Sequence, residues 1–289
     1  MAKLNKKHPQ NAAGNIYVDT TCINCDSCRW LAPDIFAETE DQSVVTAQPT
    51  TQSQYDSALM AIVACPSRSI GLVDNHPRLD HIQNTFPVRI SHNVYYCGYH
   101  SKKSFGAASY LICRPEGNIL IDCPRYSSIL ANNIKSLGGI KYHFFTHKDD
   151  VADHEKYHKH FNTQRIIHHE ELCDTISKAE ITITSNEPYQ LCPDTHLIPT
   201  PGHTKGHMVL LYKDSFLFTG DHLAFSRELN HLYAFRRHCW YSWPEQIKSM
   251  ESLLNYSFEW ILPGHGTRYH TDKSTMRKDL ITCLKWMPG

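Results

Sequence analysis

The sequence predicts a layered α/β domain that follows a smaller α+β module. Residues 88–289 alternate short apolar strand patterns with helical ones, as layered α/β domains do. The character of the chain changes near residue 75, where closely spaced cysteines give way to almost all of the 20 histidines. Between the two parts, the stretch 74–87 is polar, contains prolines and lacks a clear period, which is typical of a linker.

The predicted domains are residues 1–75 and 88–289, joined by a linker at 76–87. The first domain is expected to contain a strand at 15–19, a cysteine-rich loop followed by a short helix, a polar connection at 38–44, a second helix near 55–63 and a strand at 69–73. In the second, apolar runs rich in β-branched and aromatic residues predict strands at 94–99, 108–115, 118–123, 142–147, 165–169, 196–200, 207–213, 215–221 and 260–266. Helices are expected at 127–137, 150–160, 243–256 and 273–286.

Composition excludes several classes of protein. Lys plus Arg equals Asp plus Glu at 29 each, so no net positive charge favours a nucleic acid or an anionic membrane as partner. No apolar run approaches the roughly 18 residues of a membrane-spanning helix. The first residues lack the apolar stretch of a secretory signal, so we expect a cytoplasmic protein whose 11 cysteines are reduced, metal-bound or buried.

Four cysteines are organised like the ligands of an iron–sulfur cluster. Cys22, Cys25 and Cys28 stand in the run CINCDSC, and Cys65 is followed at once by Pro66. The doubled spacing lets one tight loop supply three thiolates to a cubane, while the fourth comes from elsewhere in the chain. Zinc modules more often use two separated CxxC pairs, so the pattern favours a [4Fe–4S] cluster and leaves zinc as the alternative.

The segment CINCDSCRWLAPDIF resembles the cluster loop and following helix of single-cluster bacterial ferredoxins, and AIVACPSRSI resembles their fourth-ligand turn. The resemblance covers about residues 14–73. It implies one [4Fe–4S] cluster held by the four cysteines, and one-electron transfer as its role. A cluster that only holds the module together remains the alternative.

Four motifs in the second domain contain histidine and aspartate, the residue types that bind metals. Each motif follows or ends an apolar strand. FFTHKDDVADH contains His147, Asp149, Asp150, Asp153 and His154; TPGHTKGH contains His203 and His207; FLFTGD contains Asp221; and LPGHG contains His265. Strand ends would point these groups into a shared cleft. Two metal ions need about three protein ligands each and a bridge, which this set supplies.

The order of these motifs resembles the metallo-β-lactamase-fold superfamily, an αββα sandwich with a dinuclear site at one edge. The resemblance covers about residues 88–289. It implies that the first metal is held by His147, Asp149 and His203, that the second is held by Asp153, His154 and His265, and that Asp221 bridges them.

The chain departs from the family's H-x-H-x-D-H motif at its second histidine. Asp149 stands there, and two extra residues precede Asp153. We choose Asp149 as the ligand because it keeps the spacing from His147, with Asp150 or a water as alternatives. A minority of the superfamily, the flavodiiron proteins, binds two irons and also has a carboxylate at this position. Oxygen donors suit iron better than an all-imidazole set does, so iron is favoured over zinc, although no flavin-binding segment is apparent.

Two enzymatic hypotheses follow, and a third without catalysis. The favoured one is a ferredoxin-coupled di-iron oxidoreductase that activates O2 or reduces a small molecule, fed by an external electron donor. The alternative is a metal-dependent hydrolase of an ester, thioester or phosphodiester with a structural or redox-sensing cluster. The third is an iron or redox sensor. The sequence assigns no catalytic residue, and it is compatible with a homodimer in which one chain's cluster serves its neighbour's metal pair.

Overall fold

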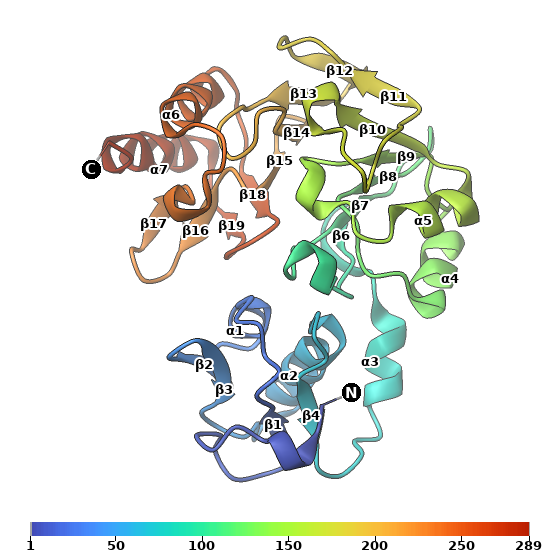
Figure 1. Ribbon diagram of the computed structural model, residues 1–289, viewed down its shortest axis with the longest axis vertical. Helices are drawn as coiled ribbons and strands as arrows, with labels where there is room; N and C mark the ends of the chain where they lie inside the picture. The colour runs from blue at the N-terminus through green and yellow to red at the C-terminus, as the bar shows by residue number, and fades with distance from the viewer. Residues whose placement is uncertain (1, 289) are drawn as a thin grey trace. The chain divides into compact units, whose positions relative to one another are not determined.

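The computed structural model describes residues 2–288, and the chain divides into two compact units (Figure 1). One unit comprises the described residues up to 141 together with 152–162. The other comprises residues 142–151 and those from 163 onward. The predicted domain borders at 75 and 88 both fall inside the first unit, and they stay a prediction.

The N-terminal part of the first unit is a small α+β module. Its two antiparallel pairs and its helices are β1 (Ile16–Val18) with β4 (Ile70–Leu72), β2 (Phe36–Thr39) with β3 (Gln42–Val45), α1 (Ser27–Leu31), α2 (Gln52–Ala64) and the 3-10 turn η1 (Leu4–Lys6). Helix α2 begins at a capping box, in which the Thr51 side chain accepts from the Gln54 N–H and the Gln54 side chain reaches back to the backbone of Thr51. Residues from all of these strands and both helices bury one shared apolar core.

The β2–β3 hairpin corrects the sequence prediction, which expected only a polar connection at 38–44. The chain turns at Glu40, which takes a positive φ of 47°, and the two strands pair in register from Phe36 opposite Val45. Val44 and Val45 are buried, while the acidic residues of the turn face solvent. The sequence prediction missed this hairpin because its turn is polar and its buried apolar residues lie at the strand ends away from the turn.

Helix α3 (Leu79–Thr85) lies in the segment predicted as a linker. Ile82 is the one buried residue of this helix. A single buried position produces no hydrophobic periodicity, so the sequence showed no sign of a helix here. The preceding Arg78 makes a two-pronged ion pair with Asp56 on α2, with nitrogen–oxygen distances of 2.9 Å. This segment is therefore structured locally and tied to the N-terminal module.

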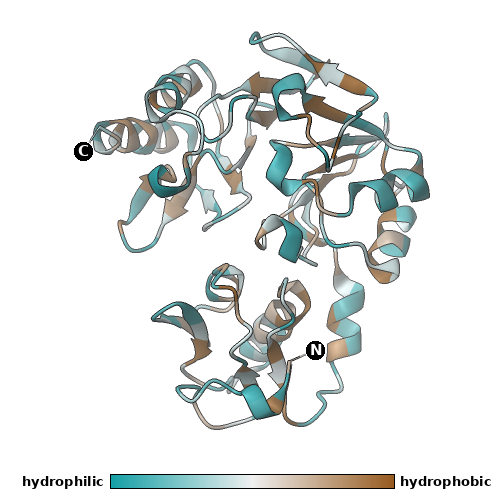
Figure 2. Ribbon diagram, viewed as in Figure 1, coloured by the Kyte–Doolittle hydropathy of each residue, from teal (hydrophilic) through white to brown (hydrophobic). Residues whose placement is uncertain are grey.

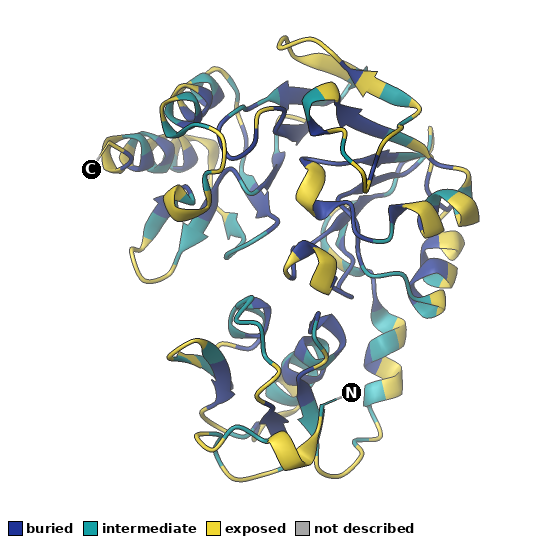
Figure 3. Cartoon of the chain, viewed as in Figure 1, coloured by how far each residue is buried: buried dark blue, intermediate teal, exposed yellow. Residues whose placement is uncertain are grey.

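The rest of the first unit contains antiparallel strands in chain order and helices that follow them. These elements are β5 (Val88–Ser91), β6 (Val94–Tyr96), β7 (Tyr110–Ile112), β8 (Ile119–Ile121), the turn η2 (Lys102–Ser104), α4 (Ser128–Ser136) and α5 (His154–Phe161). All residues of β7 and β8 are buried (Figure 3), which explains why these strands appear in the sequence as unbroken apolar runs.

The second unit contains a parallel group of strands, a larger mixed sheet and a hairpin. The parallel strands are β9 (Tyr142–Phe144), β10 (Gln164–His168) and β11 (Ile181–Ile183). The mixed sheet has the order β12 (Tyr189–Cys192), β13 (Thr195–Pro199), β14 (Met208–Tyr212), β15 (Phe216–Gly220), β18 (Trp260–Pro263) and β19 (Tyr269–His270). The hairpin pairs β16 (Ala224–Ser226) with β17 (His231–Tyr233).

Two helices of the second unit pack into the core that the mixed sheet shares with the hairpin. Helix α6 (Trp243–Ser252) is capped by the Ser242 side chain, and α7 (Lys273–Trp286) by that of Asp272. Their apolar residues, among them Met250 and Leu280, join those of β14, β15 and β18 in one cluster. Figure 2 shows the hydrophobic strands of this sheet. Short turns complete the unit: η3 (Lys148–Asp150), η4 (His169–Glu171), η5 (Arg236–His238) and η6 (Leu253–Asn255).

The strands and helices predicted for residues 88–289 are found at the expected places, with ends that differ by a few residues. The largest shifts are at two helices. Helix α5 begins at His154 rather than at 150, because residues 148–150 form the turn η3, and α6 ends at Ser252 rather than at 256, because the turn η6 follows it. Within residues 2–288, no helix combines the length and the apolar character needed to cross a bilayer.

Candidate metal centre

Loops at the ends of four strands position the candidate ligands of the second unit. His147 and the turn η3 follow β9, and His203 lies in the loop between β13 and β14. Strands β15 and β18 run parallel with Gly220 opposite Pro263, so the next residues, Asp221 and Gly264–His265, leave the sheet side by side. The carboxyl ends of neighbouring parallel strands are where α/β sheets build their sites.

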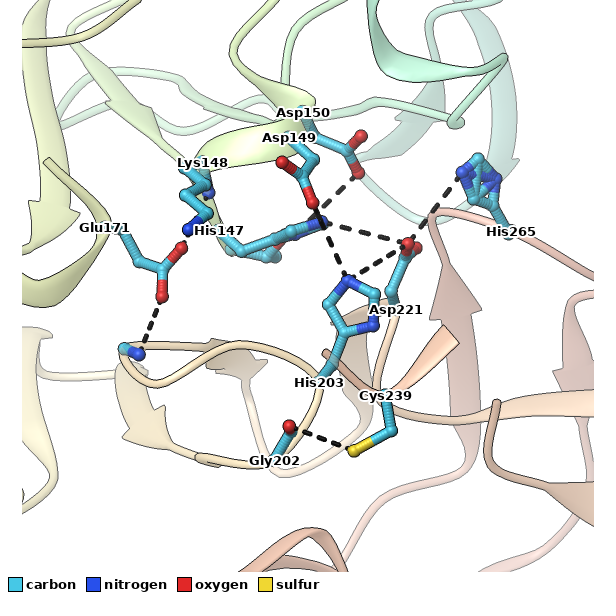
Figure 4. Close-up of polar contacts among 12 residues, drawn as sticks. His147, Lys148, Asp149, Asp150, Glu171, Gly202, His203, Asp221, Cys239 and His265 are labelled. Atoms are coloured by element: carbon cyan, nitrogen blue, oxygen red, sulfur yellow. Dashed lines mark hydrogen bonds and ion pairs between the residues drawn. The ribbon is translucent and has the colours of Figure 1, made fainter. Parts of the chain in front are cut away.

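The carboxylate of Asp221 lies at the centre of this group (Figure 4). Its Oδ2 atom is 3.8 Å from Nε2 of His147, 3.7 Å from Nε2 of His203 and 3.9 Å from Nε2 of His265. The same two Nε2 atoms of His147 and His203 also lie near Asp149, whose Oδ2 is 3.8 Å from the first and 4.0 Å from the second. Imidazoles and carboxylates therefore converge from four separate loops.

These spacings suit a bound metal ion better than direct hydrogen bonds. They exceed hydrogen-bond length, yet two donors that each bind one ion at about 2.1 Å lie no more than about 4.2 Å apart. Among residues 2–288, Nε2 of His147, Nε2 of His203 and Oδ1 of Asp221 are buried without a hydrogen-bond partner. Because buried polar atoms are nearly always satisfied, the donor set fits a cation.

Two overlapping groups have donor atoms close enough to share one ion. One contains His147, Asp149 and His203, and the other contains His147, Asp150 and Asp221. Asp150 is buried and its Oδ2 lies 4.0 Å from Nδ1 of His147, whereas the side chain of Asp149 is 50% exposed. The spacing in the sequence favoured Asp149 over Asp150 as the ligand. The turn η3 brings both carboxylates to the site, that of Asp149 from the solvent side and that of Asp150 from the interior.

Burial keeps His147 and His203 neutral. It lowers the pKa of His147 from its usual value to about 3, and it also lowers the pKa of His203. A neutral imidazole offers a lone pair to a metal, while an imidazolium does not. These two side chains are therefore ready to bind a cation at neutral pH without first losing a proton.

Glu171 joins the two loops that carry the buried histidines, and sequence analysis missed it. Its carboxylate is fully buried and accepts hydrogen bonds from the backbone N–H of Lys148 at 3.0 Å and from that of Gly206 at 2.7 Å. The first N–H follows His147 directly, and the second lies in the His203 loop (Figure 4). Nothing in the run HHEE distinguishes this glutamate from its exposed neighbour, so only the long-range contacts identify it.

The His203 loop is also held from the other side. The backbone N–H groups of Trp240 and Tyr241 both donate to the carbonyl of His203, at 2.9 and 3.1 Å. The Cys239 thiol donates to the carbonyl of Gly202 at 3.1 Å. This segment follows η5, and it fixes the backbone of a candidate ligand.

Two glycines leave room that the site requires. A Cβ on Gly264 would lie 3.0 Å from Oδ1 of Asp221 and 3.1 Å from Oδ2 of Asp150. Gly220 takes a φ of +47°, and a Cβ there would lie 2.4 Å from the Thr146 hydroxyl oxygen. Gly264 of the motif PGHG thus lets two carboxylates approach, and Gly220 of the motif TGD lets the end of β15 lie against Thr146.

Asp153 and His154, predicted as ligands of a second metal, belong to the first unit, whereas His147, Asp149, His203, Asp221 and His265 belong to the second. Oδ2 of Asp153 accepts from the backbone N–H of Tyr126 at 3.0 Å, and Oδ1 pairs with Lys103 at 3.1 Å and Lys156 at 3.4 Å. These contacts satisfy the carboxylate within its own unit. Its predicted role, and that of His154, stay predictions.

The four cysteines of the N-terminal module are neighbours, and their surroundings suit a cluster. Backbone N–H groups of Ser43 and Ser69 donate to the sulfurs of Cys22 and Cys65, at 3.5 and 3.3 Å. Burial raises the pKa of Cys25 to about 12, so its thiol needs a bound cation to lose its proton at neutral pH.

The spacing of the cysteine sulfurs also argues against a single zinc ion. Thiolates around one tetrahedral zinc lie about 3.8 Å apart. Among residues 2–288, the groups whose donor atoms all lie within 4.8 Å of one another contain histidine and aspartate but no cysteine. Three of these sulfurs are therefore not as close together as the thiolates of a closed zinc site.

Known proteins resemble both parts of the chain. Residues 18–72 match the family described as the 4Fe-4S single cluster domain of Ferredoxin I. The chain is similar in structure to TMB-1, with 14% identity and a TM-score of 0.56 over 70% of this chain and 97% of that one. A metallo-β-lactamase from Pontibacter korlensis gives 16% identity and a TM-score of 0.54 over 70% and 98%. The DIM-1 metallo-β-lactamase gives 14% and 0.54 over 68% and 95%. No curated protein matches the sequence.

These likenesses confirm the predicted fold class, which is a metallo-β-lactamase αββα fold preceded by a small ferredoxin-like module. At this level of identity the solved structures establish the fold and not the activity. The chain therefore combines a [4Fe–4S] ferredoxin domain with a metallo-β-lactamase fold that carries a candidate metal-binding site.

Proposed function

We propose that this chain is a ferredoxin-coupled oxidoreductase, in which an external donor supplies electrons through the [4Fe–4S] cluster to a metal pair, with iron favoured, that reduces O2 or another small molecule. The observation that carries the proposal is the oxygen-rich donor set. Three carboxylates, Asp149, Asp150 and Asp221, stand among the candidate ligands beside the neutral imidazoles of His147 and His203. Carboxylate ligands favour iron over zinc. Hydrolysis at a zinc site requires no electrons, so it would leave the [4Fe–4S] cluster without a role in electron transfer.

Each residue of the site has a distinct task in this proposal. His147 and His203 offer neutral nitrogen donors, and Asp221, which lies between them and His265, takes the bridging position. A bound metal pair would supply the redox chemistry and an open position for a small substrate. Asp149, half exposed, stands at the side from which solvent and substrate arrive.

Glu171 and Gly264 serve the same centre without binding the metal. Glu171 fixes the two histidine loops relative to each other through buried hydrogen bonds, so the donors need little rearrangement when a metal arrives. Gly264 keeps the space between Asp221 and Asp150 open. A site prepared in this way holds its geometry when the charge of a bound metal changes.

A hydrolase is the second candidate, and the comparison with metallo-β-lactamases favours it. The motifs that contain His147, His203, Asp221 and His265 resemble those of the superfamily. The solved structures with a similar fold include metallo-β-lactamases, and most members of the resembled superfamily hydrolyse their substrates with zinc. In that case a metal-bound water would be the nucleophile. The cluster would then be structural or redox-sensing.

Metal content separates the two candidates. Anaerobically purified protein would be analysed for iron, zinc and acid-labile sulfide, with EPR spectra before and after dithionite. About six irons per chain, with a reducible cubane signal and a separate mixed-valence signal, would support the oxidoreductase. About four irons and two zincs would overturn it and favour the hydrolase.

A kinetic test then asks whether the second site consumes electrons. Protein reduced anaerobically would be mixed with O2, NO or peroxide, and reoxidation of the cluster would be followed by absorbance. His265→Ala should slow reoxidation, while His81→Ala on the exposed face of α3 is the matched control and should not. Equal rates in wild type and His265→Ala would show that the cluster reacts without the second site.

A further inference from the structure

A buried chain of hydrogen bonds leads from a cluster cysteine to strand β6. The sulfur of Cys25 lies 3.4 Å from the hydroxyl of Ser27, which lies 2.9 Å from Nδ1 of His100. Nε2 of His100 in turn lies 2.6 Å from the hydroxyl of Tyr96. Cys25 and Ser27 belong to the matched ferredoxin domain, whereas His100 and Tyr96 lie outside it.

The chemistry of the partners fixes the direction of this chain. A cysteine bound to iron is a thiolate, which only accepts hydrogen bonds, and the carbonyl of Gly106, 3.3 Å from the Ser27 hydroxyl, also only accepts. The single proton of Ser27 therefore serves these two acceptors, so the contact with Nδ1 must be donated by His100. A neutral imidazole protonated at Nδ1 accepts at Nε2, and Tyr96 then donates to it.

Close packing holds this arrangement and keeps water away from it. Ser27, His100 and Tyr96 are each at most 2% exposed. The Trp30 ring stacks on His100 at 5.8 Å and meets Tyr96 edge-on at 5.5 Å. A hydrogen bond in such a dry environment is stronger than one in water, and successive bonds polarise one another.

The loop that carries His100 is fitted directly against the cysteine. Gly106 takes a φ of +93°, and a Cβ there would lie 2.7 Å from Cβ and 2.9 Å from the sulfur of Cys25. The backbone N–H of His100 donates to the carbonyl of Ala64, the residue before Cys65. The segment between β6 and β7, which carries both His100 and Gly106, thus lies against the N-terminal module beside Cys25 and Cys65.

We propose that Tyr96 and His100 are positioning residues that hold the Ser27 hydroxyl proton on the Cys25 sulfur and thereby raise the reduction potential of the [4Fe–4S] cluster. Reduction adds a negative charge to the cluster, and hydrogen bonds to its sulfurs stabilise that charge. Residues outside the ferredoxin domain therefore set its potential. The inference rests on the cluster in the proposed function and not on the chemistry at the histidine–aspartate site.

The test is a potentiometric titration of the purified full-length protein, with the reduced cluster followed by EPR. Ser27→Ala, His100→Phe and Tyr96→Phe should each give a more negative midpoint potential, with the largest shift for Ser27→Ala and the smallest for Tyr96→Phe. Because His100 acts through Ser27, the double variant Ser27→Ala/His100→Phe should match Ser27→Ala alone. Tyr95→Phe is the matched control, since its side chain points to the opposite face of β6, and its midpoint should equal that of wild type.

Several results would overturn the proposal. An unchanged midpoint in both His100→Phe and Tyr96→Phe would show that the chain ends at Ser27, and additive shifts in the double variant would show independent effects. If the His100→Phe variant fails to assemble its cluster, the midpoint potential of Tyr96→Phe alone tests the proposal, because this change removes one hydroxyl oxygen and preserves the packing of the ring. A wild-type protein without a reducible cubane overturns both this inference and the proposed function, whereas zinc at the second site overturns only the latter.

Discussion

The buried carboxylate of Glu171 accepts a 2.7 Å hydrogen bond from the backbone N–H of Gly206, 35 residues further along the chain. Its other oxygen accepts from the N–H of Lys148, next to His147. One side chain thereby sets the separation between two loops that each carry a buried histidine. Glu171 therefore helps to position the donors of the site.

Glu171→Gln should weaken metal binding at the second site. The amide keeps one acceptor, but its NH2 group faces the second N–H, which loses its partner. We expect metal affinity to fall about 10–100-fold and the free energy of unfolding to fall by about 1–3 kcal/mol. Competition with a coloured chelator and urea unfolding would measure these effects.

Glu170→Gln is the control for this change. Glu170 is a solvent-facing neighbour whose carboxylate pairs with Lys205 at 2.8 Å, and an exposed pair contributes little to stability. Its metal affinity should equal that of wild type. Equal affinities for the Glu170 and Glu171 variants would contradict the role given to Glu171.

Gly264→Ala should reduce metal loading while it leaves the cluster intact. The added methyl group would lie 3.0 Å from Asp221 and 3.1 Å from Asp150, so these carboxylates would have to move by a few tenths of an ångström. Metal analysis should show loss at the second site, with unchanged sulfide content and cluster absorbance. Full loading of both sites would show that the carboxylates do not converge on a metal.

Acid should destabilise the protein when the second site is empty. Burial lowers the pKa of His222 to about 3, whereas an unfolded histidine titrates near ~6.5. As pH falls below that value, the unfolded chain takes up a proton that the folded chain excludes, so the free energy of unfolding falls. At pH 5 this histidine alone should lower it by about 2 kcal/mol.

His222→Phe should remove that part of the pH dependence. Among residues 2–288, neither ring nitrogen of His222 has a hydrogen-bond partner, and a phenyl ring can keep the stacking on His207 at 5.7 Å. Urea unfolding of chelator-treated protein at pH 7 and pH 5 would measure the difference, with His81→Ala as the control. A slope equal to that of wild type would show that His222 takes up no proton on unfolding.

The sequence allowed the fold class to be predicted, and it named candidate residues that the structure brings together, because these signals were local. Asp221 and His265 follow apolar strands, and the pairing of β15 with β18 places them together as expected. Glu171 was missed because its role arises from two backbone partners distant in sequence. The hairpin of β2 and β3 was missed because its turn is polar and its buried valines stand at one end.

The choice between Asp149 and Asp150 shows a further limit. Spacing from His147 favoured Asp149, but in the 3-10 turn η3 successive side chains point in different directions. One carboxylate consequently reaches the site from solvent and the other from the interior. Only the turn geometry, which follows from the two extra residues before Asp153, reveals that both are available.

Asp149→His should shift the metal preference of the second site from iron toward zinc. The substitution restores the H-x-H pattern and replaces an oxygen donor by an imidazole, and the 50% exposure of Asp149 leaves room for the ring. Protein reconstituted anaerobically with equimolar ferrous and zinc ions would be analysed for both metals. Asp149→Asn, which removes the charge without adding an imidazole, is the control and should lower loading without raising the zinc share. An iron-to-zinc ratio unaffected by the histidine would mean that the carboxylate at this position does not select the metal, and selection would then rest with the buried Asp150 and Asp221.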